Sequence, residues 1–299
     1  MPPARPLLSA PELEPEAPPQ NVDAVGDPAT IMARATGENF PVAAPWLPQP
    51  ARDRLRSIYG FARLVDELGD AAPGDRLAAL DWLEAELDRA FAGQPSHPLM
   101  RPLAVTIAEC GLSRDPFARL IEANRRDQQT FYYDSFEDLL GYCDLSANPV
   151  GELVLEVFGV ATEERVALSN AVCSALQLIE HWQDVREDLA LGRVYVPLAD
   201  LARFGCSLAE LRAPRVGERL RRVLVLEATR TSALLDEGST LVGTLRGWPR
   251  LAVAGYVGGG RAALSALARA DYEVLAQQPR PSRRRTVGSI LRTLSGARR

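Results

Sequence analysis

Two pairs of aspartates are spaced so that their carboxylates could act together. Asp184 and Asp188 are four residues apart, and Asp66 and Asp70 repeat this spacing much earlier in the chain. Residues four apart on a helix share one face, and two like charges placed in this way repel by roughly 0.2–0.5 kcal/mol unless a cation lies between them. The two pairs therefore predict two walls of one divalent-metal site.

Each pair belongs to a longer polar stripe. Tyr59 and Arg63 precede the first pair at helical spacing, and such a stripe faces either solvent or a polar cavity. Taken alone, the first segment favours solvent. Gln177 and Glu180 precede the second pair in the same way, in a segment whose other positions are apolar. A polar stripe in so apolar a segment is better explained by a cavity.

Composition narrows the chemistry of this site. The histidines are His97 and His181, and the Lys+Arg count of 34 contains no lysine, so a histidine-based metal centre has few ligands and lysine chemistry is excluded. The four cysteines lie far apart without a C-x-x-C pair, which is typical of reduced core thiols in a cytosolic protein. We expect oxygen ligands, which favour Mg²⁺.

The expected metal indicates the expected substrate. Mg²⁺ usually combines one or two carboxylates with waters and substrate phosphates, so we infer a diphosphate. Metal-bound diphosphate is a good leaving group, and its C–O bond can break to leave a carbocation in an apolar, water-poor pocket. Arg63 and Arg193 would add charge-assisted hydrogen bonds to the phosphates, and Tyr59 would donate to a phosphate or face the cation with its ring.

The whole chain has the balance of a soluble globular protein. Its 299 residues are 46% hydrophobic and 24% charged. The net charge of -5 argues against nucleic-acid binding, which requires an excess of cations. No signal peptide and no apolar run long enough to cross a bilayer are evident, so we expect a cytoplasmic protein.

Three parts follow one another along the chain. Residues 1–29 are rich in proline and are expected to be a disordered leader, residues 30–278 form the main domain, and residues 279–299 form a basic amphipathic tail. The tail could lie on an anionic membrane surface, peripheral to the inner membrane, or could be a docked or frayed C-terminal helix.

Helical periodicity dominates and period-2 strands are nearly absent, so the predicted fold class is all-α. The expected helices cover residues 52–68, 74–91, 99–111, 115–130, 135–144, 149–158, 162–190, 198–204, 207–213, 215–236, 248–275 and 286–295.

The two acidic segments resemble those of a known family. The run from Tyr59 to Asp70 (YGFARLVDELGD) and the run from Gln183 to Pro197 (QDVREDLALGRVYVP) are similar to the two aspartate-rich motifs of the squalene/phytoene synthases, the head-to-head trans-isoprenyl diphosphate synthases. The resemblance covers about residues 30–285. It implies a single-domain isoprenoid synthase of the class I terpenoid synthase type, a helical bundle around a central cavity, with Mg²⁺ as cofactor and an isoprenoid diphosphate as substrate.

Further segments are similar to the bacterial hydroxysqualene synthase branch, namely residues 37–43, 142–151 and 175–179. That resemblance implies ionisation of presqualene diphosphate and capture of water to give hydroxysqualene, in squalene or hopanoid synthesis, with partner enzymes performing the earlier condensation and the later reduction. No G-x-G-x-x-G after a strand indicates a reducing cofactor. A full squalene or phytoene synthase remains an alternative, as does a non-catalytic member that acts as a lipid-binding or assembly factor.

The resemblance assigns roles to single residues. The expected catalytic residues are Tyr59, Arg63, Asp66, Asp70, Asp184 and Asp188, and Glu180 is added to the four aspartates as a metal ligand. The expected substrate-binding residues are Asn39, Arg63, Tyr142, Asn148, Gln177, Arg193 and Tyr195. Cap or turn roles explain Asn39 and Asn148 nearly as well. His181 is either a packing residue or the proton acceptor for water.

This sequence departs from the family pattern at three points. Glu180 stands where the family commonly has asparagine, so it is either a ligand or a mark of altered activity, and Glu67 replaces a frequent aspartate. Glycines at 258–260 interrupt a predicted helix and could open the floor of the pocket.

Overall fold

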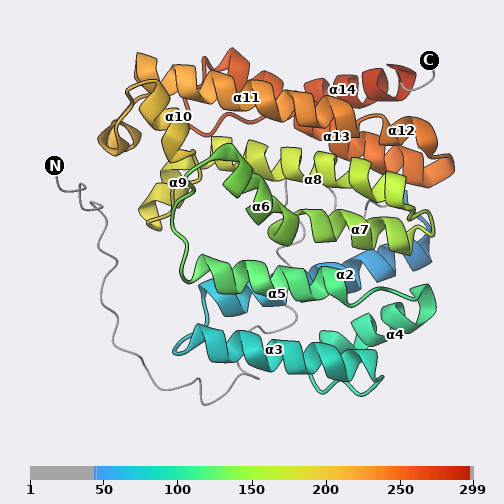
Figure 1. Cartoon of the computed structure of the whole chain (residues 1–299). Helices are drawn as coiled ribbons and strands as arrows, with labels where there is room; N and C mark the ends of the chain where they lie inside the picture. The colour runs from blue at the N-terminus through green and yellow to red at the C-terminus, as the bar shows by residue number, and fades with distance from the viewer. Residues whose placement is uncertain (1–43, 45, 297–299) are drawn as a thin grey trace.

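Helices form nearly all of the regular structure in the computed structural model, which describes residue 44 and residues 46–296 (Figure 1). The described elements are α2 (Gln49–Asp70), α3 (Arg76–Phe91), α4 (Met100–Cys110), α5 (Asp115–Asp127), α6 (Phe136–Ser146), α7 (Asn148–Val157), α8 (Glu163–Gln183), α9 (Val185–Ala190), α10 (Leu198–Arg203), η3 (Leu208–Arg212), α11 (Glu218–Gly238), α12 (Leu241–Thr244), α13 (Gly247–Arg269) and α14 (Arg283–Gly296). Within this part of the chain, β-pairing is limited to one bridge between Tyr132 and Val194, which confirms the all-α class. The predicted leader lies outside the described residues.

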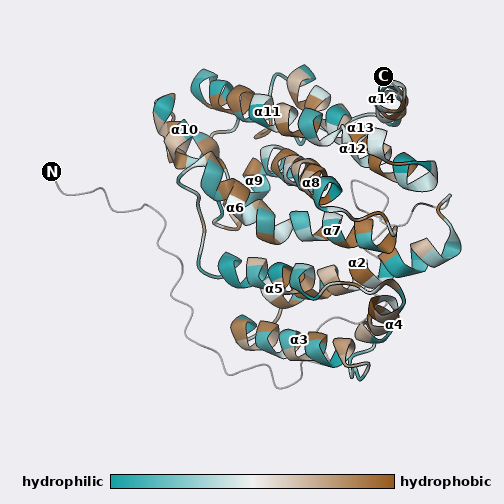
Figure 2. Ribbon diagram, turned by 45° about the vertical axis from the view of Figure 1, so that its right-hand side comes forward, coloured by the Kyte–Doolittle hydropathy of each residue, from teal (hydrophilic) through white to brown (hydrophobic). Residues whose placement is uncertain are grey.

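The helices stack in layers with α8 in the middle. Figure 1 shows α3 and α4 at one side, then α2 and α5, then α6 to α8, and finally α11, α13 and α14. The helices carry both hydrophobic and hydrophilic residues (Figure 2), as expected for helices with one buried face. Helix α8 packs against α7, α11 and α13, so the second acidic segment is fixed from several sides.

Helix α2 illustrates how the local sequence positions the site. Phe61, Leu64 and Leu68 are completely buried on one face, and Phe61 meets the ring of Phe117 on α5 edge-on, with 5.1 Å between the ring centroids. Burial of each large apolar side chain contributes roughly 1.5–3 kcal/mol. Because this face is fixed in the core, the polar stripe is held on the opposite side.

Two long predicted helices end earlier than the periodicity indicates. The predicted helix over residues 162–190 is interrupted at Asp184, whose φ of -105° and ψ of 15° separate α8 from α9. The predicted helix over residues 248–275 ends at Arg269, because Asp271 and Tyr272 adopt left-handed φ values of 52° and 57°. Both corrections concern backbone geometry that apolar periodicity does not record.

The prediction that the glycines at 258–260 open the pocket floor is wrong. They lie within the continuous helix α13, and Gly258 and Gly260 allow close helix packing. A Cβ atom on Gly258 would lie 2.7 Å from the Cα of Ile290 on α14, and one on Gly260 would lie 2.8 Å from Leu176 Cδ2. Gly258 therefore marks where α14 crosses α13.

The C-terminal tail contains α14, and this helix is docked on the bundle. Ser289 and Thr293 are buried against it, and the Arg250 side chain donates to the Leu294 carbonyl oxygen at 3.0 Å. Among the described helices, α13 alone has the length and hydropathy for a membrane span, but half of its apolar window is buried within the protein, as in a core helix.

Candidate active site

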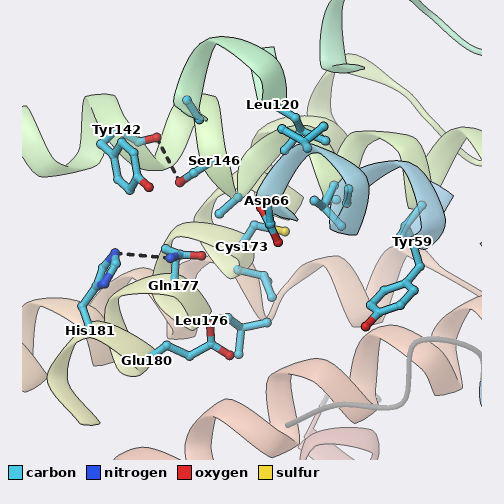
Figure 3. A pocket seen from close by; sticks show the side chains of 18 of the residues that line it. Tyr59, Asp66, Leu120, Tyr142, Ser146, Cys173, Leu176, Gln177, Glu180 and His181 are labelled. Carbon is cyan, nitrogen blue, oxygen red and sulfur yellow. Dashed lines mark hydrogen bonds between the residues drawn. The ribbon is translucent and has the colours of Figure 1, made fainter. Parts of the chain in front are cut away.

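A cavity of about 480 Å³ lies between α2, α5, α7 and α8 and extends to α12 and α13. Figure 3 shows Asp66 from α2 and Gln177, Glu180 and His181 from α8 around the same space. Much of the remaining wall is apolar, formed by Leu55, Ile58, Val65, Leu120, Val150, Val154, Leu155, Val172, Leu176, Leu241 and Val253. The cavity thus combines an acidic region with a long apolar region.

The first acidic segment forms one wall. Tyr59, Arg63, Asp66 and Asp70 all line the cavity, as the single-stripe prediction requires. Arg63 Nη1 lies 3.3 Å from Asp66 Oδ2. The guanidinium is therefore already directed at the acidic region, where it could also meet an anionic ligand.

The second acidic segment forms the opposite wall. Glu180 lines the cavity near the end of α8, and Asp184 and Asp188 line it from the break and from α9. The break leaves their spacing nearly helical, since the Asp188 amide donates to the Asp184 carbonyl oxygen at 2.8 Å. Burial raises the pKa of Asp184, and a hydrogen bond from the Gln278 amide opposes that effect.

Asp188 has a buried oxygen with no hydrogen-bond partner among the described residues. This atom, Oδ2, lies 3.8 Å from His181 Nδ1, beyond hydrogen-bond range. Leaving a carboxylate oxygen buried in this way costs about 1–3 kcal/mol. Such an atom at the edge of a polar cavity is suited to a cation.

Arg193 joins the two walls. It follows the turn at Gly192, which has a left-handed φ of 80°, and its Nη2 donates to Asp70 Oδ1 at 2.8 Å. Burial works against the charged guanidinium, but Tyr195 and Asp70 outweigh it and raise the pKa of Arg193. A fixed positive charge therefore lies between the two acidic motifs.

Aromatic rings surround His181 at one side of the cavity. The ring of His181 stacks on Tyr195 with 3.6 Å between centroids, and Tyr142 is 5.9 Å from Tyr195. His181 also lies in reach of Gln177, whose Nε2 is 3.3 Å from His181 Nε2 (Figure 3). His181 is thus packed against aromatic residues and lines the cavity at the same time.

Asp127 was not identified from the sequence. It lines the cavity at the end of α5, and the Tyr142 hydroxyl donates to its Oδ2 at 2.8 Å. Burial raises the pKa of Asp127 to about 6, partly opposed by the Tyr142 hydrogen bond. Its spacing of three residues from Asn124, another lining residue, was the available signal, but the surrounding charged residues made that face resemble a solvated one.

Asn148, one of the two predicted asparagines, does not join this group. Asn148 lies outside the cavity wall: its amide donates to Asp144 at 2.6 Å, and its carbonyl oxygen accepts from Ser174 at 2.9 Å. These contacts join α6, α7 and α8. Asn148 therefore holds these helices together, and the prediction that it contacts substrate is not supported. Asn39 lies outside the described residues.

The donor set fits a hard cation. Within residues 46–296, no three His, Cys, Asp or Glu side chains are close enough to hold a metal ion by themselves. The acidic groups on both walls, with the unpartnered Asp188 oxygen, match the mode in which Mg²⁺ takes one or two carboxylates and completes its coordination with water and substrate phosphates.

Comparison with known proteins agrees with this geometry. The squalene/phytoene synthase profile matches residues 33–286. The chain belongs to the squalene/phytoene synthase family. Enzymes of this family process isoprenoid diphosphates and generally use a divalent metal ion to ionise the diphosphate.

Individual relatives span more than one activity within the squalene/phytoene synthase family. A hydroxysqualene synthase of Rhodopseudomonas palustris is 35% identical over 70% of this chain and 72% of its own length. Phytoene synthase 1 of Arabidopsis thaliana is 32% identical over 66% of this chain and 50% of its own length. The solved squalene synthase HpnC from Alicyclobacillus acidocaldarius superposes with a TM-score of 0.76 at 50% identity, covering 81% of this chain and 92% of that one.

Proposed function

We propose that this protein ionises presqualene diphosphate with the help of Mg²⁺ and captures water to give hydroxysqualene and diphosphate. The observation that carries the proposal is one cavity in which two acidic walls face each other beside a long apolar wall. Similarity to hydroxysqualene synthases from Rhodopseudomonas palustris and Sinorhizobium fredii, at 35% and 33% identity, supports this choice of reaction.

The acidic residues of the two walls are proposed to bind the metal ion. Asp66, Asp70, Asp184 and Asp188, with Glu180, would hold Mg²⁺. Bound Mg²⁺ would neutralise the diphosphate and make it a better leaving group.

The two arginines at the acidic walls are proposed to bind the diphosphate. Arg63 and Arg193 each already contact a wall aspartate, so their guanidinium groups can donate to diphosphate oxygens without a large movement. The apolar wall would accommodate the isoprenoid chains and exclude water from the cation until capture.

Capture of water requires a base. The attacking water forms a C–O bond with the carbocation and must lose one proton. His181 lines the cavity and is fixed by stacking on Tyr195, and we assign the proton to one of its ring nitrogens. Tyr59, Tyr142 and Gln177 are proposed to position the substrate from the surrounding wall.

Product analysis tests the reaction. Incubation with presqualene diphosphate and Mg²⁺ in ¹⁸O-labelled water should give hydroxysqualene that carries the label, detected by mass spectrometry. Asp66→Asn and Asp184→Asn should abolish turnover while circular dichroism shows an unchanged helical fold. Normal turnover by both variants would refute the metal-site assignment.

A second candidate is the condensation of two farnesyl or geranylgeranyl diphosphates, as in a squalene or phytoene synthase. The 32% identity to phytoene synthase 1 of Arabidopsis thaliana supports this candidate. Incubation with farnesyl diphosphate alone or geranylgeranyl diphosphate alone distinguishes the two reactions, because a C30 or C40 condensation product would favour condensation. A non-catalytic lipid-binding role is opposed by the retention of all four aspartates in one cavity.

We also propose peripheral membrane contact through the outer face of α14. Val287 and Leu291 are 55% and 61% exposed there, and arginines at 283–285 and 292 surround them with no acidic residue on the helix. Such a face combines apolar contact with attraction to anionic lipid. The protein should sediment with phosphatidylglycerol vesicles, and replacement of Val287 and Leu291 by serine should weaken this binding. If it sediments equally with phosphatidylcholine vesicles, the arginines do not contribute to binding by attraction to anionic lipid.

A further inference from the structure

The connection between α13 and α14 passes close to the second acidic segment. Val274 and Leu275 are buried, with 2% and 1% of their surface exposed, and anchor the connection in the core. The Glu273 carboxylate accepts from the Val216 amide at 3.1 Å and from the Ala276 amide at 3.2 Å. The path of residues 273–276 is therefore fixed by buried and hydrogen-bonded groups.

The same connection bonds to the break between α8 and α9 at three successive places. Arg186 Nη1 donates to the Leu275 carbonyl oxygen at 2.9 Å, the Gln183 amide donates to the Pro279 carbonyl oxygen, and the Gln278 amide donates to Asp184 Oδ1. The break is thus held by residues 275–279, which we call the strap.

The Asp184 carboxylate accepts a hydrogen bond from the strap through the Gln278 amide. Asp184 makes no side-chain capping bond to α9 that would fix it. Arg280 Nε donates to Gln278 Oε1 at 2.8 Å. Because a guanidinium can only donate, this contact assigns the oxygen of the Gln278 amide to Arg280 and leaves its NH₂ group for Asp184.

We propose that Gln278 is a positioning residue for Asp184, and that Arg280 orients Gln278 in turn. The inference rests on the proposed role of Asp184 as a metal ligand. Hydrogen-bond partners that orient ligating carboxylates commonly change metal affinity by about 10–100-fold when they are lost. With one Asp184 oxygen held by the strap, the other is presented for a cation.

The chain offers a matched control for Gln278. Gln277 is the preceding residue, of the same type and exposed, and it makes no hydrogen bond within the described part of the chain. Gln278→Met removes the donor with little change in side-chain length, and Gln277→Met makes the same chemical change beside it. Arg280→Ala removes the group that orients Gln278. Because Arg280 is exposed, this change should leave folding intact.

The test measures Mn²⁺ binding in the presence of inorganic diphosphate by electron paramagnetic resonance, together with the melting temperature. Gln278→Met should raise the Mn²⁺ dissociation constant about tenfold or more, Arg280→Ala should raise it by a smaller factor, and Gln277→Met should leave it unchanged. If Gln278→Met fails to fold, the Mn²⁺ dissociation constant of Arg280→Ala tests the positioning role instead. A purely structural role would lower the melting temperature and leave the affinity of the folded protein unchanged.

Asp184→Asn separates this inference from the proposed function. If Asp184→Asn weakens Mn²⁺ binding and neither Gln278→Met nor Arg280→Ala does, the positioning role is wrong and the metal site stands. If Asp184→Asn also binds Mn²⁺ like the wild type, the metal assignment itself fails.

Discussion

Replacing Arg193 by methionine tests whether the cation between the two acidic walls acts on the substrate. Arg193 Nη2 is 2.8 Å from Asp70 Oδ1, and the two side chains are 17% and 54% exposed. Since Asp70 is half exposed, the pair should contribute no more than about 1 kcal/mol to the free energy of unfolding. A charge-assisted hydrogen bond to the departing diphosphate should contribute roughly 1.5–3 kcal/mol in the transition state.

These two magnitudes predict different outcomes in two assays. With saturating Mg²⁺, kcat/KM for presqualene diphosphate should fall roughly 10- to 150-fold in Arg193→Met. Urea unfolding should show a loss of no more than about 1 kcal/mol. Arg215→Met, at an exposed position with no hydrogen bond or ion pair in the described part of the chain, serves as the control and should change neither value. A kcat/KM within about twofold of wild type would refute the phosphate contact, and a loss of stability well above 1 kcal/mol would show that Arg193 is chiefly structural.

Four further variants test the surroundings of the site and the packing of the bundle. Tyr142→Phe removes the hydrogen bond to Asp127, whose pKa is about 6, so the melting temperature should fall more at pH 8, where the carboxylate is charged, than at pH 5; equal losses would contradict this. Burial raises the pKa of Glu227 from 4.5 to about 8, so the folded state binds this proton more tightly than the unfolded state does. The melting temperature of the wild type should therefore fall as the pH rises from about 4.5 to about 8, and that of Glu227→Gln should change less over the same range. Gly258→Ala should cost about 1–3 kcal/mol in urea unfolding because its Cβ would meet Ile290, whereas Gly259→Ala, with open space around it, should stabilise α13 by up to about 1 kcal/mol; equal effects would show that α14 is not closely packed at Gly258.

Periodicity predicted the helices well because each buries one apolar face. The stripe from Tyr59 to Asp70 lies on one continuous helix that faces the cavity, as the spacing indicates. The break at Asp184 was missed because Val185 and Leu189 continue the apolar pattern across it. The strap is hydrogen-bonded to the break, and a contact between residues 94 positions apart leaves no periodic signal.

The site was predictable to the extent that its residues share a motif. The aspartates, Glu180 and Arg193 occur in two segments whose spacing carries the information, and all of them line the cavity. Asp127 lies among other polar residues and Gln278 lies next to Gln277, so neither stands out in the sequence, and only the folded arrangement brings them to the motifs. Asn148 has a residue type suited to a cavity, but its partners Asp144 and Ser174 account for both ends of its amide.

The strap has a consequence for the order in which the protein assembles. The Arg193–Asp70 pair joins residues 123 positions apart, and the Gln278–Asp184 hydrogen bond joins residues 94 positions apart. Contacts of such high sequence separation form late, because closing long loops costs chain entropy before the contact contributes. During synthesis, helices α2 to α8 can therefore form while Asp184 is still unrestrained, and the second acidic wall reaches its final geometry only after residue 278 has been made and has folded back onto the break.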